Sequence, residues 1–516
     1  MTTAQAIRTW PSTPNGRFTV IGIIALVIAI LSALTLAIVG IPIPLILLVS
    51  AVAVWVIAAR PDTATLAFAF ILYANIPVIA VDFHGLPEMA AVATPLVLAI
   101  PLLVYLVVRR EAVIFTPAMA LMLAFLAVML VSAAASTDLQ TGVASVMTYV
   151  SEGIILVALV ANAVHSMRTL RGVLWMILIA GALMGGLSIY QEVTHTYRDP
   201  YLGFAQTLYT PGSEEAAVAV LANDARPRLA GPIGSKNRYA QILVVLLPIA
   251  LLAYRLASRR WVRWAAVASG MAMLGGIALT FSRGAGVAIV ALGAVMVLLR
   301  ILPVRRLIPM AVLLVVVTVL VAPQYVTRLE TVGTLLSDPA DVDNAVLGRA
   351  TSNLASLRAF AEHPILGVGP GGYATNYSRE YANELGLRHF DSNRRAHNLY
   401  LEIGADLGVP GLAIFLGILG VSMVQLWRLR RAWRGRSRVN SEIATALFLA
   451  LVGYAMTGMF LHLAYARYFW FLIAVANAGI WLLQRELAEA DRADSPKVIG
   501  ELAPVEVPAV SSRRRR

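Results

Sequence analysis

The stretch of this chain best suited to chemistry is Arg394–Asn398, which contains two arginines and a histidine and is followed by a short polar segment. If residues 397–406 are helical, Asn398, Glu402 and Asp406 recur every four residues and share one face. Gly408 would end this helix, and the proline two residues later suits the first turn of the next one. The pattern indicates a site, although a helix cap with a solvated polar face would produce it too.

The composition places this polar segment in an unusually apolar chain. Of 516 residues, 59% are hydrophobic and 13% are charged, whereas a soluble protein would have about a quarter charged residues. We therefore predict an all-α polytopic membrane protein. The chain has no cysteine, which excludes disulfides, thiolate zinc sites and cysteine nucleophiles.

About fourteen transmembrane helices are predicted, with twelve as the lower limit. Each candidate is an apolar run close to the ~20 residues needed to cross a bilayer. The candidates are residues 18–39, 41–59, 63–81, 89–108, 115–135, 143–164, 170–190, 238–255, 261–281, 284–302, 307–323, 408–427, 441–461 and 467–484.

Arginines are distributed unevenly between the connecting loops. They follow the even-numbered spans, whereas the short loops after the first, third and fifth spans contain neither lysine nor arginine. Because cytoplasmic loops are enriched in these residues, we predict that both termini are cytoplasmic. The net charge of +13 (41 Lys and Arg against 28 Asp and Glu) then reflects contact with the lipid bilayer, and no nucleic acid partner is expected.

This topology divides the chain into five segments. Residues 1–17 form a cytoplasmic N-terminal segment, and residues 18–323 contain the first eleven spans with an outer loop at about 192–236. Residues 324–407 form an extracytoplasmic loop too long for a plain connector, in which residues 349–361 have helical spacing and end at Glu362–Pro364. Residues 408–484 contain the last three spans, and residues 485–516 are expected to be a disordered basic cytoplasmic tail.

Two motifs in the large loop have both a chemical and a structural interpretation. Gly367–Gly372 fits GxGxxG, but no strand precedes it and a proline lies inside it, so a tight turn is favoured over a dinucleotide site. Asp341 and Asp343 resemble the pair that nucleotide-sugar transferases use to hold a metal. A solvated loop is the favoured interpretation on an outer surface, and neither a metal site nor a cofactor is predicted.

Cationic side chains gather on the predicted outer face. Arg283 lies between two apolar spans with almost no loop, where a guanidinium either pairs with a ligand or snorkels to the interface. The other members are Lys236, Arg238, Arg349, Arg394 and Arg395. Guanidiniums bind phosphate through two parallel hydrogen bonds, so this cluster suits an anionic lipid headgroup and in particular a lipid diphosphate.

Two other charged residues suit a different class of protein. Glu152 lies inside the sixth span and needs a buried partner or a proton, as in a proton-coupled transporter. Arg467, at the outer start of the last span, is either a second functional cation or an anchor. Charges buried within spans would favour a transporter, whereas charges at the outer interface favour an enzyme, and most of the charges here are of the second kind.

The order of several motifs resembles the O-antigen ligase and polymerase superfamily of bacterial membrane glycosyltransferases. The segments that carry this resemblance span roughly residues 230–420 and are Gly231–Asn237, Ser282–Gly284, Arg349, His363–Gly371, His397–Glu402 and Gly408–Leu412. The resemblance implies a type C glycosyltransferase fold in the bacterial inner membrane. The chain departs from the family in having more than the twelve spans expected of ligases, and in Ser235–Asn237, where Asn-Pro-Asn is common.

The resemblance also implies a reaction and its residues. A preassembled glycan would pass from undecaprenyl diphosphate to a lipid, glycan or protein acceptor on the outer face, with inversion and without a metal. Arg283 and Arg349 would grip the diphosphate, while His397, whose pKa near 6.5 permits the role, would orient or deprotonate the acceptor hydroxyl. Residues expected to bind substrate are Lys236, Asn237, Arg238, Arg394, Arg395, Asn398 and Glu402.

Two questions stay open at the level of sequence. Ligases and polymerases differ only in the acceptor, and no motif identifies it. The superfamily also contains members described as bicarbonate-transport proteins, so a transporter or a lipid-glycan flippase that uses Glu152 and Arg467 is the alternative.

Overall fold

The fold is almost entirely helical. A computed structural model describes residues 59–208, 228–305, 312, 344–386, 389–462 and 466–494. Within these ranges the exception is an antiparallel pair of short strands, β1 (Gln206–Leu208) and β2 (Arg228–Gly231). The strands belong to the predicted outer loop at 192–236, for which no strand was expected.

The described residues form a series of helices. In chain order they are α4 (Pro61–Tyr73), α5 (Ile76–Asp82), α6 (Glu88–Ala93), η3 (Thr94–Leu98), α7 (Ala99–Leu103), η4 (Val104–Val108), α8 (Pro117–Ala135), α9 (Leu139–Tyr149), η5 (Val150–Ile155), α10 (Leu156–Ala163), α11 (Met167–Thr194), η6 (Tyr201–Gly203), α13 (Lys236–Leu256), α14 (Arg260–Leu279), α15 (Arg283–Leu298), α18 (Asn344–Glu362), η8 (Tyr373–Tyr377), α19 (Ser378–Glu384), α20 (Leu399–Trp433), α21 (Arg438–Gly458) and α22 (Ala466–Asp494).

The prediction of a polytopic membrane protein is confirmed. Eight helices of the described chain are long and apolar enough to cross a membrane, and α4 with α5 would make a ninth, bent by 53°. Two shorter apolar helices occupy the predicted spans 89–108 and 284–302. The predicted spans 18–39, 41–59 and 307–323 lie outside the described residues, apart from isolated positions, so the count of fourteen stays a prediction.

Polar side chains at the helix starts explain where several spans begin. Thr116, Asp138, Ser166, Ser282 and Ser437 each precede a helix and accept a hydrogen bond from a backbone N–H of its first turn. Such caps satisfy donors that have no partner within the helix. The caps therefore favour a helix start at each of these positions, directly before an apolar run.

Aromatic side chains fill the centre of the helical bundle. Phe125 of α8 contacts Tyr149 of α9 and Phe415 of α20, and Phe415 contacts Phe469 and Trp470 of α22, with ring centroids 4.6–6.4 Å apart throughout this cluster. The rings meet edge to face or tilted, as aromatic quadrupoles prefer. This cluster ties together helices that are far apart in the chain, since Tyr149 contacts Trp470, and it supports the helix that starts beside His397.

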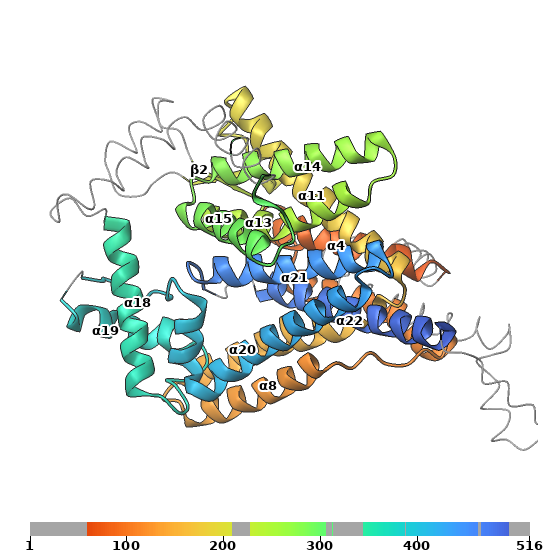
Figure 1. Cartoon of the computed structure of the whole chain (residues 1–516). Helices are drawn as coiled ribbons and strands as arrows, with labels where there is room; N and C mark the ends of the chain where they lie inside the picture. The colour runs from red at the N-terminus through yellow and green to blue at the C-terminus, as the bar shows by residue number, and fades with distance from the viewer. Residues whose placement is uncertain are drawn as a thin grey trace, which may run out of the picture.

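Helices α18 and α19 lie together at one end of this bundle, on the left in Figure 1, across the ends of α8 and α20. The helix expected at residues 349–361 is present as α18 and ends at Glu362 as predicted. Helix α20 is interrupted at Gly408, where φ is 65° and ψ is −165°. The predicted break is therefore confirmed, and it separates a short polar segment from a long apolar one.

The segment that follows α18 docks against this break. The backbone N–H of Val409 donates to the carbonyl of Pro364 at 2.7 Å. A Cβ atom at Gly408 would lie 2.5 Å from the carbonyl oxygen of Ile365. The break thus brings the end of the large loop onto the membrane helix that follows it.

Gly408→Ala should destabilise the protein by about 3 kcal/mol, because its φ and ψ are nearly exclusive to glycine and the added methyl would collide with the docked loop. Gly420→Ala, in the same helix but with no atom within 4 Å of the added Cβ, should be neutral or slightly stabilising. Thermal unfolding in detergent measures both. Equal midpoints for the two variants would show that the break does not support the fold.

One boundary differs from the prediction. Helix α22 continues to Asp494 instead of ending near residue 484, so the first ten residues of the expected disordered tail are helical. An ion pair between Arg485 and Glu489, four residues apart at 3.1 Å, supports this extension. Hydropathy detects where an apolar run ends, whereas a helix can continue into water on such pairs.

Candidate functional site

His397 lies immediately before the polar segment of α20. Asn398 is the N-cap of this helix, and its Oδ1 accepts hydrogen bonds from the backbone N–H groups of Tyr400 at 3.0 Å and Leu401 at 3.2 Å. The capping role that the sequence left open is therefore real. Because the cap fixes the backbone at residue 398, it also fixes the position of the neighbouring histidine.

Asp406, two residues before the break at Gly408, holds the glycine-rich segment. Its carboxylate accepts hydrogen bonds from the backbone N–H groups of Gly371 and Tyr373, both at 3.0 Å. Gly367, Gly369 and Gly371 all have positive φ, and this chain reversal is the predicted tight turn. The segment is packed against α20 through Asp406. This agrees with the prediction of a turn and not a dinucleotide site.

Two arginines act on the His397 imidazole. Burial first, and then the positive charges of Arg349 on α18 and of Arg394, lower the pKa of His397 to about 4. The expectation of an ordinary pKa near 6.5 is therefore wrong for the protein without substrate. With this lowered pKa the imidazole is neutral at pH 7 and can accept a proton, but burial and the arginine charges make it a weak base.

Arg395 and Glu402 form an ion pair beside this histidine. The guanidinium Nη1 lies 3.3 Å from Oε1 of Glu402, whose side chain is buried. The second carboxylate oxygen, Oε2, has no hydrogen-bond partner within the described structure. Arg394 is held differently, since its guanidinium lies 4.8 Å from the centre of the Phe390 ring and its backbone N–H donates to Ser378 Oγ at 2.7 Å.

A second histidine, His462 between α21 and α22, belongs to the same cluster. Arg238 of α13 is buried and donates to the backbone carbonyl of His462 and, at 2.6 Å, to Oε1 of Gln241. Burial and the charges of Arg238, Arg395 and His397 lower the pKa of His462 well below its usual range. His462 was missed in the sequence, although its place in a short loop on the predicted outer side was an available signal.

The remaining predicted residues lie around a small cavity next to this cluster. Arg349 and Asn237 line the cavity together with Ser282 and Gly284, the two neighbours of Arg283. Arg283 is the first residue of α15 and is partly buried, as is Lys236 at the start of α13. The structure therefore brings the starts of α13, α15 and α20 together with α18. Asp341 and Asp343 lie outside the described residues.

Glu152 and Arg467, the residues of the transporter alternative, pair with each other. Arg467 Nη1 lies 3.5 Å from Glu152 Oε1, and its Nη2 donates to Oδ1 of Asn75 at 2.8 Å. They line a cavity of about 340 Å³ that also includes Asp82 and Glu88. Glu152 thus has a partly buried partner of opposite charge within the described structure.

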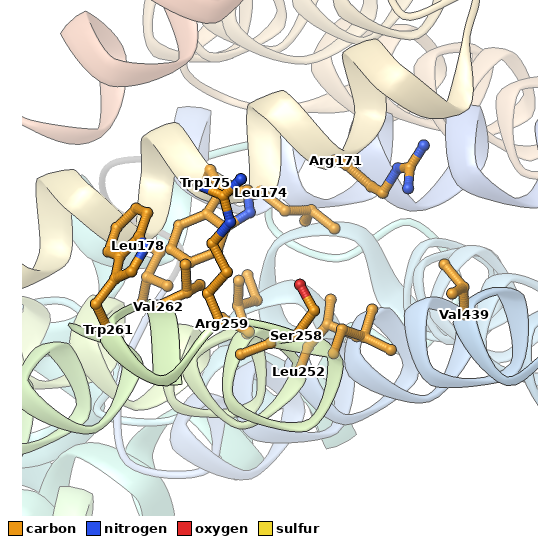
Figure 2. A pocket seen from close by; sticks show the side chains of 14 residues that line it. Arg171, Leu174, Trp175, Leu178, Leu252, Ser258, Arg259, Trp261, Val262 and Val439 are labelled. Atoms are coloured by element: carbon orange, nitrogen blue, oxygen red, sulfur yellow. The ribbon is translucent and has the colours of Figure 1, made fainter. Parts of the chain in front are cut away.

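A larger cavity, of about 440 Å³, lies between α11 and the turn from α13 to α14 (Figure 2). Its walls are mainly apolar, with Leu174, Trp175 and Leu178 from α11, and its charged residues are Arg171 and Arg259. It contains no carboxylate or imidazole. General acid–base chemistry usually relies on such groups, and they gather instead around His397.

The described residues define a multi-pass helical membrane protein in which arginine and histidine side chains gather at one end of an apolar bundle. Residues 268–416 match the family model described as O-antigen ligase, which confirms the resemblance inferred from the motifs. The matched region includes Arg283, Arg349 and His397, whereas Lys236, Arg238 and His462 lie outside it. No curated protein sequence matches the chain. The family match supports a membrane glycosyltransferase-like function.

Proposed function

We propose that this protein transfers a glycan from a polyprenyl-diphosphate carrier, undecaprenyl diphosphate in bacteria, to a lipid, glycan or protein acceptor on the outer face of the cytoplasmic membrane. The observation that carries the proposal is the convergence of Arg349 and Arg394 on His397 at one end of the bundle, with Arg395 acting on the neighbouring His462. Guanidiniums next to an imidazole combine binding of an anion with transfer of a proton.

On the donor side, the arginines would bind the diphosphate. Arg349, with Arg283 at the start of α15, would take up the negative charge that develops when the bond between the sugar and the diphosphate breaks. Fixed charges placed where a transition state becomes anionic are among the strongest catalytic contributions. Bidentate guanidiniums can do this without a metal ion.

On the acceptor side, His397 would receive the proton of the attacking hydroxyl. The hydroxyl oxygen bonds to the anomeric carbon from the face opposite the diphosphate, so the configuration inverts. A bound diphosphate would offset the charges of Arg349 and Arg394 and thereby raise the pKa of His397. The base would become stronger when the donor is in place. Glu402 would position Arg395 beside His397 and the bound donor.

The direct test uses the purified protein in detergent, a lipid-diphosphate glycan as donor and a panel of glycan and lipid acceptors. Transport requires a sealed membrane, so product formed in detergent can arise only from chemistry. We expect consumption of donor, release of polyprenyl diphosphate and undiminished activity in a strong chelator. If no acceptor leads to donor consumption, the proposal fails.

The pH dependence should reveal the lowered pKa of His397. The plot of kcat/KM against pH reports the pKa values of the free enzyme. On its acid side (the acid limb), kcat/KM should fall near pH 4, because activity is lost as the imidazole becomes protonated. The acid limb of kcat should lie at higher pH, since bound diphosphate offsets the neighbouring arginines. Steady-state rates between pH 3.5 and 8 measure both limbs. A kcat/KM limb at pH 6.5 would contradict the role assigned to Arg349 and Arg394.

Glu152→Gln separates the enzyme from the transporter alternative. On the enzyme proposal, the Glu152–Arg467 pair supports the structure and lies away from the reacting groups, so transfer in detergent should change less than about threefold. The measurement is the same donor-consumption assay. If this variant abolishes function in cells while the purified wild-type protein never consumes donor, the transporter alternative is correct.

A further inference from the structure

A second cationic cavity lies at the other end of the helices that carry the candidate site. Helix α13 begins at Lys236 beside the site and, over its 21 residues, rises about 30 Å to Leu256. At this far end a cavity of about 410 Å³, the arginine pocket, is lined by Arg255, Arg300, Ile301, Arg430, Trp433, Arg434, Gly435, Arg436, Arg438, Ser441, Glu442 and Thr445.

The charge of the arginine pocket is far from balanced. Its single carboxylate, Glu442, already pairs with Arg255 at 2.7 Å. Arg436 pairs with Asp491 of α22, which does not line the pocket. For the other four arginines, the described chain provides no carboxylate within ion-pair distance. They are Arg300, Arg430, Arg434 and Arg438.

Arg430 is the residue that requires an explanation. Its side chain is only 8% exposed, and its guanidinium lies 4.6 Å from the centre of the Trp427 ring. The ring attracts the charge, and the guanidinium makes no hydrogen bond to an oxygen of the described residues, so its N–H groups face the cavity. Holding a mostly buried cation beside other cations is costly unless an anion is bound to it. Enrichment of arginine in cytoplasmic loops explains the exposed arginines, but not this buried one.

We propose that the arginine pocket binds the phosphate group of an anionic phospholipid, on the membrane face opposite His397. Phosphate fits because planar guanidiniums bind its oxygens through pairs of hydrogen bonds. A lipid source is favoured because the pocket lies where α13 and α20 end and α21 begins, at the depth of lipid headgroups. The apolar cavity of Figure 2 uses the next residues of the same helices, Leu256 and Val439, and so offers apolar surface nearby.

The test measures lipid retained by the full-length protein in detergent, by native mass spectrometry after addition of cardiolipin, phosphatidylglycerol or phosphatidylcholine. We expect the two anionic lipids to be retained and phosphatidylcholine to be lost. Arg430→Gln and the exposed Arg434→Gln should each weaken retention about tenfold, as expected for loss of a charge-assisted hydrogen bond. Arg434→Gln keeps the test valid if the buried variant fails to fold.

Arg428→Gln is the matched control, because Arg428 is exposed on the same helix, carries the same charge and does not line the pocket. Equal weakening by this control, or equal retention of the zwitterionic lipid, would overturn the proposal, because binding would then depend on overall charge or hydrophobicity. A second arm adds pyrophosphate or inorganic phosphate. If these bind to the pocket while no lipid is retained, the site takes soluble phosphate and the lipid assignment is wrong.

Discussion

His397→Ala should slow glycan transfer by about 10²–10⁴-fold while leaving the lipid-diphosphate donor bound, because it removes the proposed general base without touching the arginines. The imidazole is held next to Arg349 and Arg394 by the capped start of α20. Donor should therefore accumulate in cells that express the variant. Single-turnover transfer and donor retention in detergent measure the two effects separately.

His389→Ala is the control for this prediction. His389 lies in the same segment before α20, but its side chain is 75% exposed and its nearest charged partner, Asp391, is 3.7 Å away. We expect this variant to transfer glycan at the normal rate. If His397→Ala retained more than a tenth of the activity, the histidine would be a structural residue, and His462 would become the next candidate for the base.

The part of the site that the sequence predicted is the part that depends on local chemistry. An asparagine before a helix, a glycine followed by a proline, and apolar residues at helical spacing each act within a few residues. The cap at Asn398, the break at Gly408 and helix α18 follow from them. Hydropathy likewise predicts the spans, because the thickness of a bilayer sets the length of any helix that crosses it.

The part that the sequence could not predict depends on residues distant in the chain. Arg238 binds the backbone of His462, 224 residues further on, and Glu152 pairs with Arg467. Nothing local distinguishes these partners from other polar residues at the ends of spans. The same limit applies to the pKa of His397, which reflects burial and a charge from α18 and not the histidine itself.

Arg349→Gln should reduce transfer by about 10²–10³-fold, the usual effect of removing one group that stabilises charge in a transition state. It should also move the acid limb of kcat/KM to higher pH. Arg349 lowers the pKa of His397, so loss of its positive charge favours the protonated imidazole, and activity is then lost at a higher pH. A residue that only supported the fold would not produce this second effect.

Arg349→Lys separates charge from geometry. Lysine keeps the positive charge, so the acid limb should stay near that of the normal enzyme, but it lacks the planar fork that binds two phosphate oxygens, so transfer should still fall. Arg358→Gln is the control on the same helix, where the guanidinium pairs with Glu362 and Glu384 at the surface. If Arg349→Lys transferred glycan at the normal rate, the arginine would act as a simple charge and the diphosphate would be held elsewhere. If Arg349→Gln lowered the rate without moving the limb, Arg349 and His397 would not act on each other during the reaction.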